Sequence, residues 1–245
     1  MFGAATFSTT FAATSTLATP TAGKTLYTGY EVIGPYSTLR VEGSWVVPTA
    51  NCATTPNSVS NISVIIDGIN GEGDAMEIGT YQNCVHGVAE YGAFVNVYPT
   101  TGYYGENHGN ISKVVVHPGD VIEAQGTWRP TGQKPVNWNT NFEDKTTGGV
   151  AVDTDAHTPT GFTPALDSGA LILSSDGHIL TSLSTISSGR HYTSVHDSDI
   201  TGGQHATSTF GETASMSGYT LVTWEIPGTS ITTLGTSGSS FQITG

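Results

Sequence analysis

The absence of helical patterning is the feature that most constrains what this chain can fold into. Its 31 glycines and 11 prolines interrupt the sequence roughly every 8–15 residues, and the runs between them alternate or are rich in Val, Ile, Thr and Tyr, as strands are. Regularly spaced strands with no helix between them predict antiparallel sheets packed face to face. The expected strands are Thr38–Val47, Asn61–Asp67, Glu90–Tyr98, Ile111–His117, Asp120–Trp128, Val136–Asp144, Ala170–Ser174, Tyr219–Ile226 and Ser239–Thr244.

One turn is predicted from its chemistry. Lys113–His117 leads into Pro118-Gly119-Asp120, where proline presets φ and glycine permits a positive φ. We therefore expect a tight hairpin between two strands at this point.

The length of 245 residues is typical of a large all-β domain, so residues 26–245 are expected to form one sandwich. No run of about 18 apolar residues occurs, so no membrane span is expected. The N-terminus also lacks the basic start of a signal peptide.

The first 25 residues form a separate segment in this interpretation. Ala5, Phe7, Phe11 and Ala13 would share one strand face, and the Thr-, Ala- and Pro-rich stretch Leu17–Gly23 that follows them is interpreted as a linker. Three alternatives are open: a tail, an edge strand of the same domain, or a strand donated to a neighbouring molecule's sheet.

Charge excludes some partners. The chain has 20 Asp and Glu against 7 Lys and Arg, a net charge of −13. Phosphate backbones and anionic lipids need Lys and Arg to neutralise them, so nucleic acid and membrane surfaces are not expected partners. The low Lys content with many Thr and Gly favours an extracellular or acidic setting.

Cys52 and Cys84 are the two cysteines. In a chain of secreted character such a pair predicts one disulfide, which closes a loop of about 30 residues and contributes about 3 kcal/mol in the chain-entropy model. The alternative is two unpaired thiols in a cytosolic protein. No spacing of Cys and His supports zinc.

Several short motifs occur together in a recognisable order. They are Val41-Glu-Gly-Ser-Trp-Val-Val-Pro48 with Cys52 after it, Asp67-Gly68, Ile78-Gly-Thr80 with Cys84 after it, Tyr98-Pro99, Val116-His-Pro-Gly-Asp120 and Phe142-Glu-Asp-Lys-Thr-Thr-Gly148. In this order the chain resembles the glutamic peptidases (eqolisins), particularly their bacterial and archaeal branch. The resemblance implies a concanavalin-like antiparallel β-sandwich and a Cys52–Cys84 disulfide.

The resemblance also implies a chemistry: acid-range peptide hydrolysis in which a Glu activates water and a Gln stabilises the tetrahedral intermediate. Carried over residue by residue, the Gln position is Glu77 and the Glu position is Ala170. The cleft positions become Ser63 and the run Phe94, Val95 and Asn96. Because a methyl group cannot accept a proton, no catalytic residues are expected.

Other constellations are weaker. Asp197 and Asp199 are candidate calcium ligands on a polar loop, and no other cofactor is expected. Asn61 and Asn110 match the glycan acceptor pattern. No G-x-S-x-G motif supports a serine hydrolase.

The preferred hypothesis is therefore a non-catalytic extracellular structural protein, a filament, pilus or cell-surface subunit that forms a homopolymer by donating its N-terminal strand. The first alternative is a secreted acid-acting glutamic endopeptidase that uses Glu77. The second is a carbohydrate-binding module with Tyr103, Tyr104 and Trp128 as candidate contacts.

Overall fold

The structure is a computed structural model. It describes residues 16–18, 26–34, 38–53, 56–57, 59–66, 75–98, 111, 113–129, 136–158, 167–174, 183–194, 205–209, 220–225, 230–232 and 241–244. These residues form two packed sheets and contain no helix. The prediction of an all-β antiparallel sandwich is confirmed.

The first sheet, sheet A, has seven strands. Its spatial order is β1 (Thr16–Ala18), β13 (Thr220–Trp224), β2 (Leu26–Ile33), β10 (Asp167–Ser174), β4 (Ser60–Ile66), β5 (Ala75–Val85) and β6 (Val88–Tyr98). Neighbours are antiparallel except β1 and β13, which are parallel. Thr16–Ala18, within the N-terminal segment, is thus the edge strand of its own chain's sheet.

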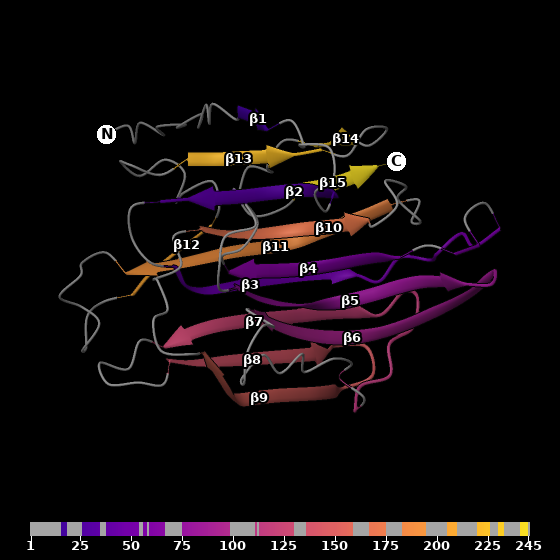
Figure 1. Cartoon of the computed structure of the whole chain (residues 1–245), viewed down its shortest axis with the longest axis horizontal. Coiled ribbons are helices and arrows are strands. Elements are labelled where there is room, and N and C mark those ends of the chain that lie inside the picture. Colours follow the sequence, from indigo (N-terminus) through magenta and orange to yellow (C-terminus); the bar gives the residue numbers. More distant parts are fainter. Residues whose placement is uncertain are drawn as a thin grey trace, which may run out of the picture.

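The second sheet, sheet B, has eight strands. Its order is β14 (Ser230–Ile231), β15 (Phe241–Thr244), β11 (Leu183–Ser194), β3 (Thr38–Val46), β7 (Val121–Arg129), β8 (Val136–Asp144) and β9 (Gly149–Thr158), and β12 (His205–Thr209) pairs with β11. Figure 1 shows the strands of both sheets running side by side, with β1 and β13 at one end of the stack and β9 at the other.

The core lies between the sheets and is filled by alternate residues of strands such as β2, β4, β5 and β7. Its largest fully buried side chains are Trp45, Phe142, Ile62, Ile66, Met76, Ile78 and Ile122. Trp45 of sheet B donates its indole N–H to Thr80 Oγ1 of sheet A at 3.0 Å. The largest core side chain therefore has its one polar atom satisfied across the interface.

Two glycines let the sheets approach closely. A Cβ at Gly43 of β3 would lie 2.5 Å from Val64 Cγ1 of β4, and one at Gly126 of β7 would overlap Met76 Cε of β5. Side chains of sheet A thus occupy the space that these residues of sheet B leave empty.

The segment Ile111–His117 is not a strand, so the prediction of a strand and a hairpin there is wrong. The turn itself forms: Gly119 has φ 90°, and the Asp120 N–H donates to His117 O at 3.2 Å. Val114 and Val116 alternate into the core as a strand would. However, the Ile111 N–H donates to Ala93 O of β6 at 2.8 Å, and the Val114 N–H donates to Ile111 O at 3.3 Å, a local bond rather than a strand pairing.

Asp120 and Asp144, which belong to two of the motifs that carry the resemblance, accept hydrogen bonds within turns. Asp120 accepts the His117 N–H at 2.7 Å. Asp144 accepts the N–H groups of Thr146 and Thr147 and the Thr147 hydroxyl at 2.8, 3.2 and 2.6 Å. Burial alone would raise the pKa of Asp144, but these bonds and one with Asp120 outweigh it and lower that pKa. Asp120 thus holds the turn that leads into β7, and Asp144 holds the turn between β8 and β9.

The Cys52–Cys84 disulfide is formed, with Cα atoms 5.3 Å apart. It joins the loop after β3 to the end of β5, and so ties a segment that follows sheet B to sheet A. The interval of 32 residues matches the loop length expected from the sequence.

The Gly43 contact gives the first prediction. Gly43→Ala should lower the free energy of unfolding by about 1–3 kcal/mol, because the new methyl group meets a β-branched side chain that cannot turn aside. In a Val64→Ala background the same change should cost at least about 1 kcal/mol less. Urea unfolding of the four proteins of this cycle measures the difference.

Gly126→Ala is the matched control, because the atom it meets is the flexible end of Met76. It should cost less than Gly43→Ala. Equal costs at Gly43 with and without Val64 would show that the sheets are not in contact there.

Candidate functional site

The outer face of sheet A is the face that points away from the core. On β4, Ile62, Val64 and Ile66 belong to the core, so Ser63 and Ile65 lie on the outer face. On β5, Met76 and Ile78 belong to the core, which places Glu77 on the outer face beside them. Strand alternation alone therefore sets a carboxylate on this face.

Glu77 is a buried carboxylate, only 5 % exposed. Its Oε1 accepts the Ser63 hydroxyl at 2.7 Å, and the Asn96 side chain is a second hydrogen-bond partner. Burial raises the pKa of Glu77, and the bonds from Ser63 and Asn96 oppose that rise without cancelling it. The Glu77 carboxyl group therefore takes up a proton at a higher pH than an exposed glutamate does.

The cross-strand register shows what faces Glu77 from the neighbouring strands. Glu77 pairs with Ile65 of β4 and Asn96 of β6, and Ile65 pairs in turn with Gly169 of β10. Gly169 pairs with Glu31 of β2. The row through Glu77 therefore contains a glycine at the β10 position.

Ala170 is the position to which the family's Glu was assigned. Its backbone pairs with Tyr30 of β2 and Val64 of β4, and both of these belong to the core. Position 170 thus lies in the row next to that of Glu77. The residues on either side in β10 are Gly169 and Leu171, so a shift of the assignment by one position still brings no carboxylate.

The predicted cleft residues separate by face. Ser63 and Asn96 contact Glu77, and Phe94 lies on the outer face with them, opposite Gly79 in the register. Val95 belongs to the core instead. Two of the positions taken from the family, Ser63 and Asn96, therefore hydrogen bond to a third, Glu77.

A second buried carboxylate on this face escaped the sequence analysis. Glu31 of β2 is fully buried and accepts the Trp224 indole N–H at 2.6 Å. Trp224 also packs with Tyr27 against Ile65. Since β10 and β4 separate β2 from β5, three strand spacings of about 4.8 Å place the backbones of Glu31 and Glu77 about 14 Å apart. The two do not form a carboxylate pair.

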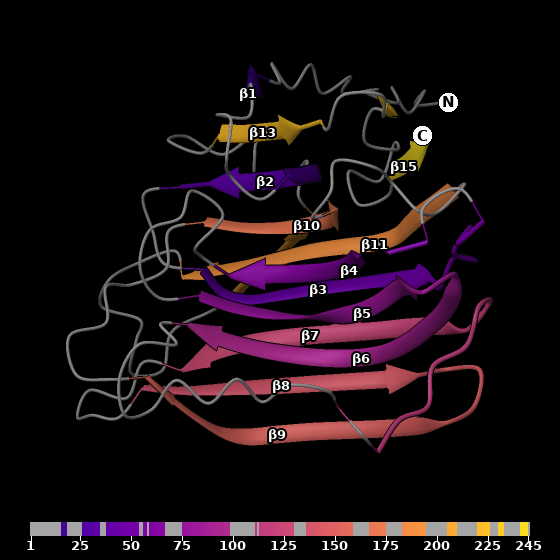
Figure 2. The same ribbon diagram turned by 45° about the vertical axis from the view of Figure 1, so that its right-hand side comes forward.

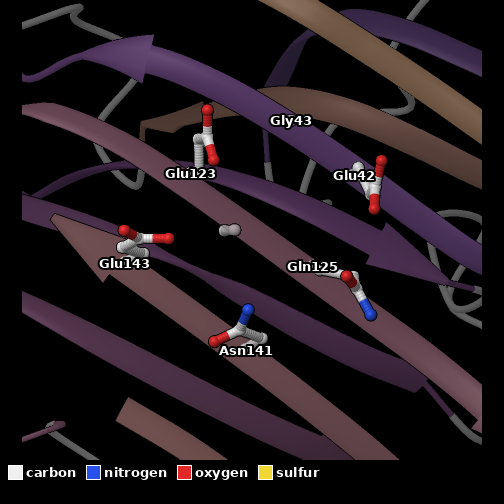
Figure 3. Close-up of a pocket in the computed structure, with 7 residues that line it drawn as sticks. Glu42, Gly43, Glu123, Gln125, Asn141 and Glu143 are labelled. Carbon is white, nitrogen blue, oxygen red and sulfur yellow. The ribbon is translucent and has the colours of Figure 1, made fainter. Parts of the chain in front are cut away.

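A different hollow lies on the outer face of sheet B (Figure 3) and has a volume of 260 Å³. It is lined by Glu42, Gly43, Glu123, Ala124, Gln125, Asn141 and Glu143. In the strand register Glu123 of β7 is opposite Glu143 of β8. Gln125 of β7 is opposite Glu42 of β3 on one side and Asn141 of β8 on the other.

The acidic charge of this hollow is compensated at its rim. Arg40 forms an ion pair with Glu42, and Lys145 lies 3.1 Å from Glu143 and 3.5 Å from Glu123. The hydrogen bond to Glu143 raises the pKa of Lys145. Three carboxylates with two cations leave little net charge to attract a ligand.

Several predicted site residues fall elsewhere. Asn61 lies within the central strand β4 and is partly buried. Ala5, Phe7, Phe11, Ala13, Asn110, Asp197, Asp199, Tyr103 and Tyr104 lie outside the described residues, and of Trp128 only the backbone is described. Among described side chains, no group of three or more His, Cys, Asp or Glu is placed to hold a metal ion. No helix in the described part of the chain is long and apolar enough to cross a membrane.

Comparison with solved structures identifies the fold. Scytalido-glutamic peptidase bound to a peptide-based transition state analog superposes with a TM-score of 0.60 at 14 % identity, covering 90 % of this chain and 98 % of that one. The eqolisin-family peptidase SCP-B in complex with the tripeptide Ala-Ile-His gives 0.58 at 12 % identity with the same coverage. No protein-family model and no curated protein sequence matches the chain. The protein thus has the glutamic-peptidase fold, as the resemblance implied.

The raised pKa of Glu77 gives the second prediction. A carboxyl group whose pKa is higher in the folded state favours folding below its unfolded pKa and loses that contribution as pH rises through the folded pKa. Glu77→Gln should therefore stabilise the protein at pH 7, where the buried carboxyl group of the wild type is charged at a cost, and have little effect near pH 3, where it is protonated. Urea unfolding at both pH values measures the change.

Gln is the appropriate replacement because its carbonyl oxygen still accepts the Ser63 hydroxyl. An equal effect of the substitution at both pH values would show that Glu77 has an ordinary pKa.

Proposed function

We propose that this chain is a non-catalytic protein on a glutamic-peptidase fold that serves outside the cell as a structural subunit. The observation that carries the proposal is the composition of β10. From Ser168 to Ser174 this strand reads Ser-Gly-Ala-Leu-Ile-Leu-Ser, so none of its residues beyond Asp167 has a carboxylate to place on the face that carries Glu77. A general base must lie within hydrogen-bond reach of the water that it activates.

The surroundings of Glu77 support the same proposal. The carboxylate is almost inaccessible, and neighbouring side chains hydrogen bond to it. At position 77 the resemblance to the glutamic peptidases implies a glutamine, whose amide group donates a hydrogen bond. The Glu77 side chain can donate one only when it is protonated. Its hydrogen bonds join β4, β5 and β6, which is a structural role.

The assembly part of the proposal concerns the N-terminal segment. Ala5, Phe7, Phe11 and Ala13 give residues 1–15 a strand pattern, and β1 follows them directly at the edge of sheet A. We propose that residues 1–15 form a strand of a neighbouring subunit's sheet, which makes a homopolymer held by main-chain hydrogen bonds. Cys52–Cys84 fits the oxidising setting of such a protein.

An acid peptidase is the second candidate. The observation in its favour is Glu77 itself, since a buried carboxyl group with a raised pKa, on the outer face of a sheet, is typical of functional sites. In this alternative Glu77 would act as the base. Asp167 is the one residue of β10 that has a carboxylate, and so the one candidate partner on that strand.

An assay of peptide hydrolysis separates the two candidates. The wild-type chain is incubated with a denatured protein at pH values from about 2 to 5, beside Glu77→Gln and Asp167→Asn, and peptides are counted by mass spectrometry. The proposal predicts no cleavage above the level of the Glu77→Gln protein. Cleavage by the wild type that either substitution abolishes would establish the peptidase instead.

A further inference from the structure

Among the sheet edges, β9 is distinctive. In the described part of the chain it pairs with β8 alone and ends the order of sheet B. The corresponding edge of sheet A, β6, is contacted by the loop at Ile111, whose N–H bonds to Ala93 O. An edge strand with free N–H and C=O groups is a template for one more strand.

The side chains of β9 are unusual for an open edge. Val150 and Val152 are 53 % and 62 % exposed. They lie opposite Glu143 and Asn141 in the register, and so on the outer face of sheet B, beside the hollow of Figure 3. Protected edges usually present charged side chains. In β9 the charged residues are Asp153 and Asp155, whereas the part of the strand before them exposes two β-branched apolar residues.

A bulge defines how much of this edge is regular. The register of β8 and β9 shifts between Trp138 and Thr140. Residues Gly149 to Asp153 pair without interruption before the shift, and we call this stretch the β9 edge. Its five residues offer a short, regularly paired strand to a partner.

We propose that the β9 edge accepts residues 1–15 of a second copy of this chain. This inference rests on the proposed function and names the acceptor that it requires. Residues 1–15, Met-Phe-Gly-Ala-Ala-Thr-Phe-Ser-Thr-Thr-Phe-Ala-Ala-Thr-Ser, contain no charged side chain. A chain of net charge −13 repels its own copies, and an uncharged donor strand avoids adding to that repulsion.

The donor pattern fits the acceptor. Phe7 and Phe11 occupy positions of the same parity, so one face of the added strand would carry them toward the exposed valines. Aromatic and β-branched side chains opposite one another contribute about 0.2–1 kcal/mol per pair in a sheet. Burial of Val150 and Val152 would add to this.

The placement of donor and acceptor sets the type of assembly. In both Figure 1 and Figure 2, β1 lies at one end of the stacked strands and β9 at the other. Residues 1–15 directly precede β1 and, if extended, span at most about 50 Å. Donor and acceptor at opposite ends give a head-to-tail contact, in which each subunit keeps one free donor and one free acceptor for the next copy.

The test uses full-length variants. Phe7→Asp with Phe11→Asp disables the donor, and Val150→Lys with Val152→Lys disables the acceptor. Val46→Lys is the control, because Val46 is a 47 % exposed valine on β3, and β7 and β8 separate β3 from β9 in the sheet order. Assembly is followed by sedimentation, and thermal unfolding checks that each variant is folded.

The donor and acceptor variants should each raise the concentration needed for polymers about tenfold or more, and Val46→Lys should leave it unchanged. An equal mixture of the two disabled variants should stop at dimers, since one intact donor then meets one intact acceptor. Polymers from the acceptor variant, with none from the donor variant, would refute the β9 edge and leave the proposed function standing. Polymers from the donor variant, or none from the wild type, would refute the proposed function itself.

Discussion

The close approach of the two sheets around Trp45 is the constraint on which the rest of the structure depends. Trp45 fills the interface and bonds to Thr80 on the opposite sheet, while Gly43 leaves the space that Val64 occupies. This fixes which residues of β4 and β5 face inward. Because strands alternate, it fixes at the same time which residues, Glu77 among them, lie on the outer face of sheet A.

The fold of a glutamic peptidase is therefore compatible with a different use of that face. The motifs that carry the resemblance are mostly residues of the core and the turns, such as Trp45, Asp120 and Asp144. They preserve the sandwich whatever the outer face does. The chemistry that the resemblance implies would need a few side chains of β5 and β10, where this chain has a buried glutamate and a strand of small and apolar residues.

Sequence patterns predicted the strands that have ordinary alternation, including β3, β4 and β8, and the all-β class. They missed β5 because buried polar residues such as Gln82 and Thr80 break its apolar pattern. They missed β9 because its valines face solvent, the reverse of the usual alternation. Glu31 could not be found either, since its partner Trp224 is distant in sequence. The assignment of position 170 shows the limit of alignment by motif, because an error of one residue in the alignment places a side chain on the opposite face of the strand.

Electron microscopy of the purified wild-type chain tests the central claim of this account most directly. The account predicts unbranched filaments in which each subunit contacts the next through one repeated, head-to-tail interface and an added strand lies beside β9. Separate particles of a single 25.4 kDa chain at every pH and concentration examined would contradict it.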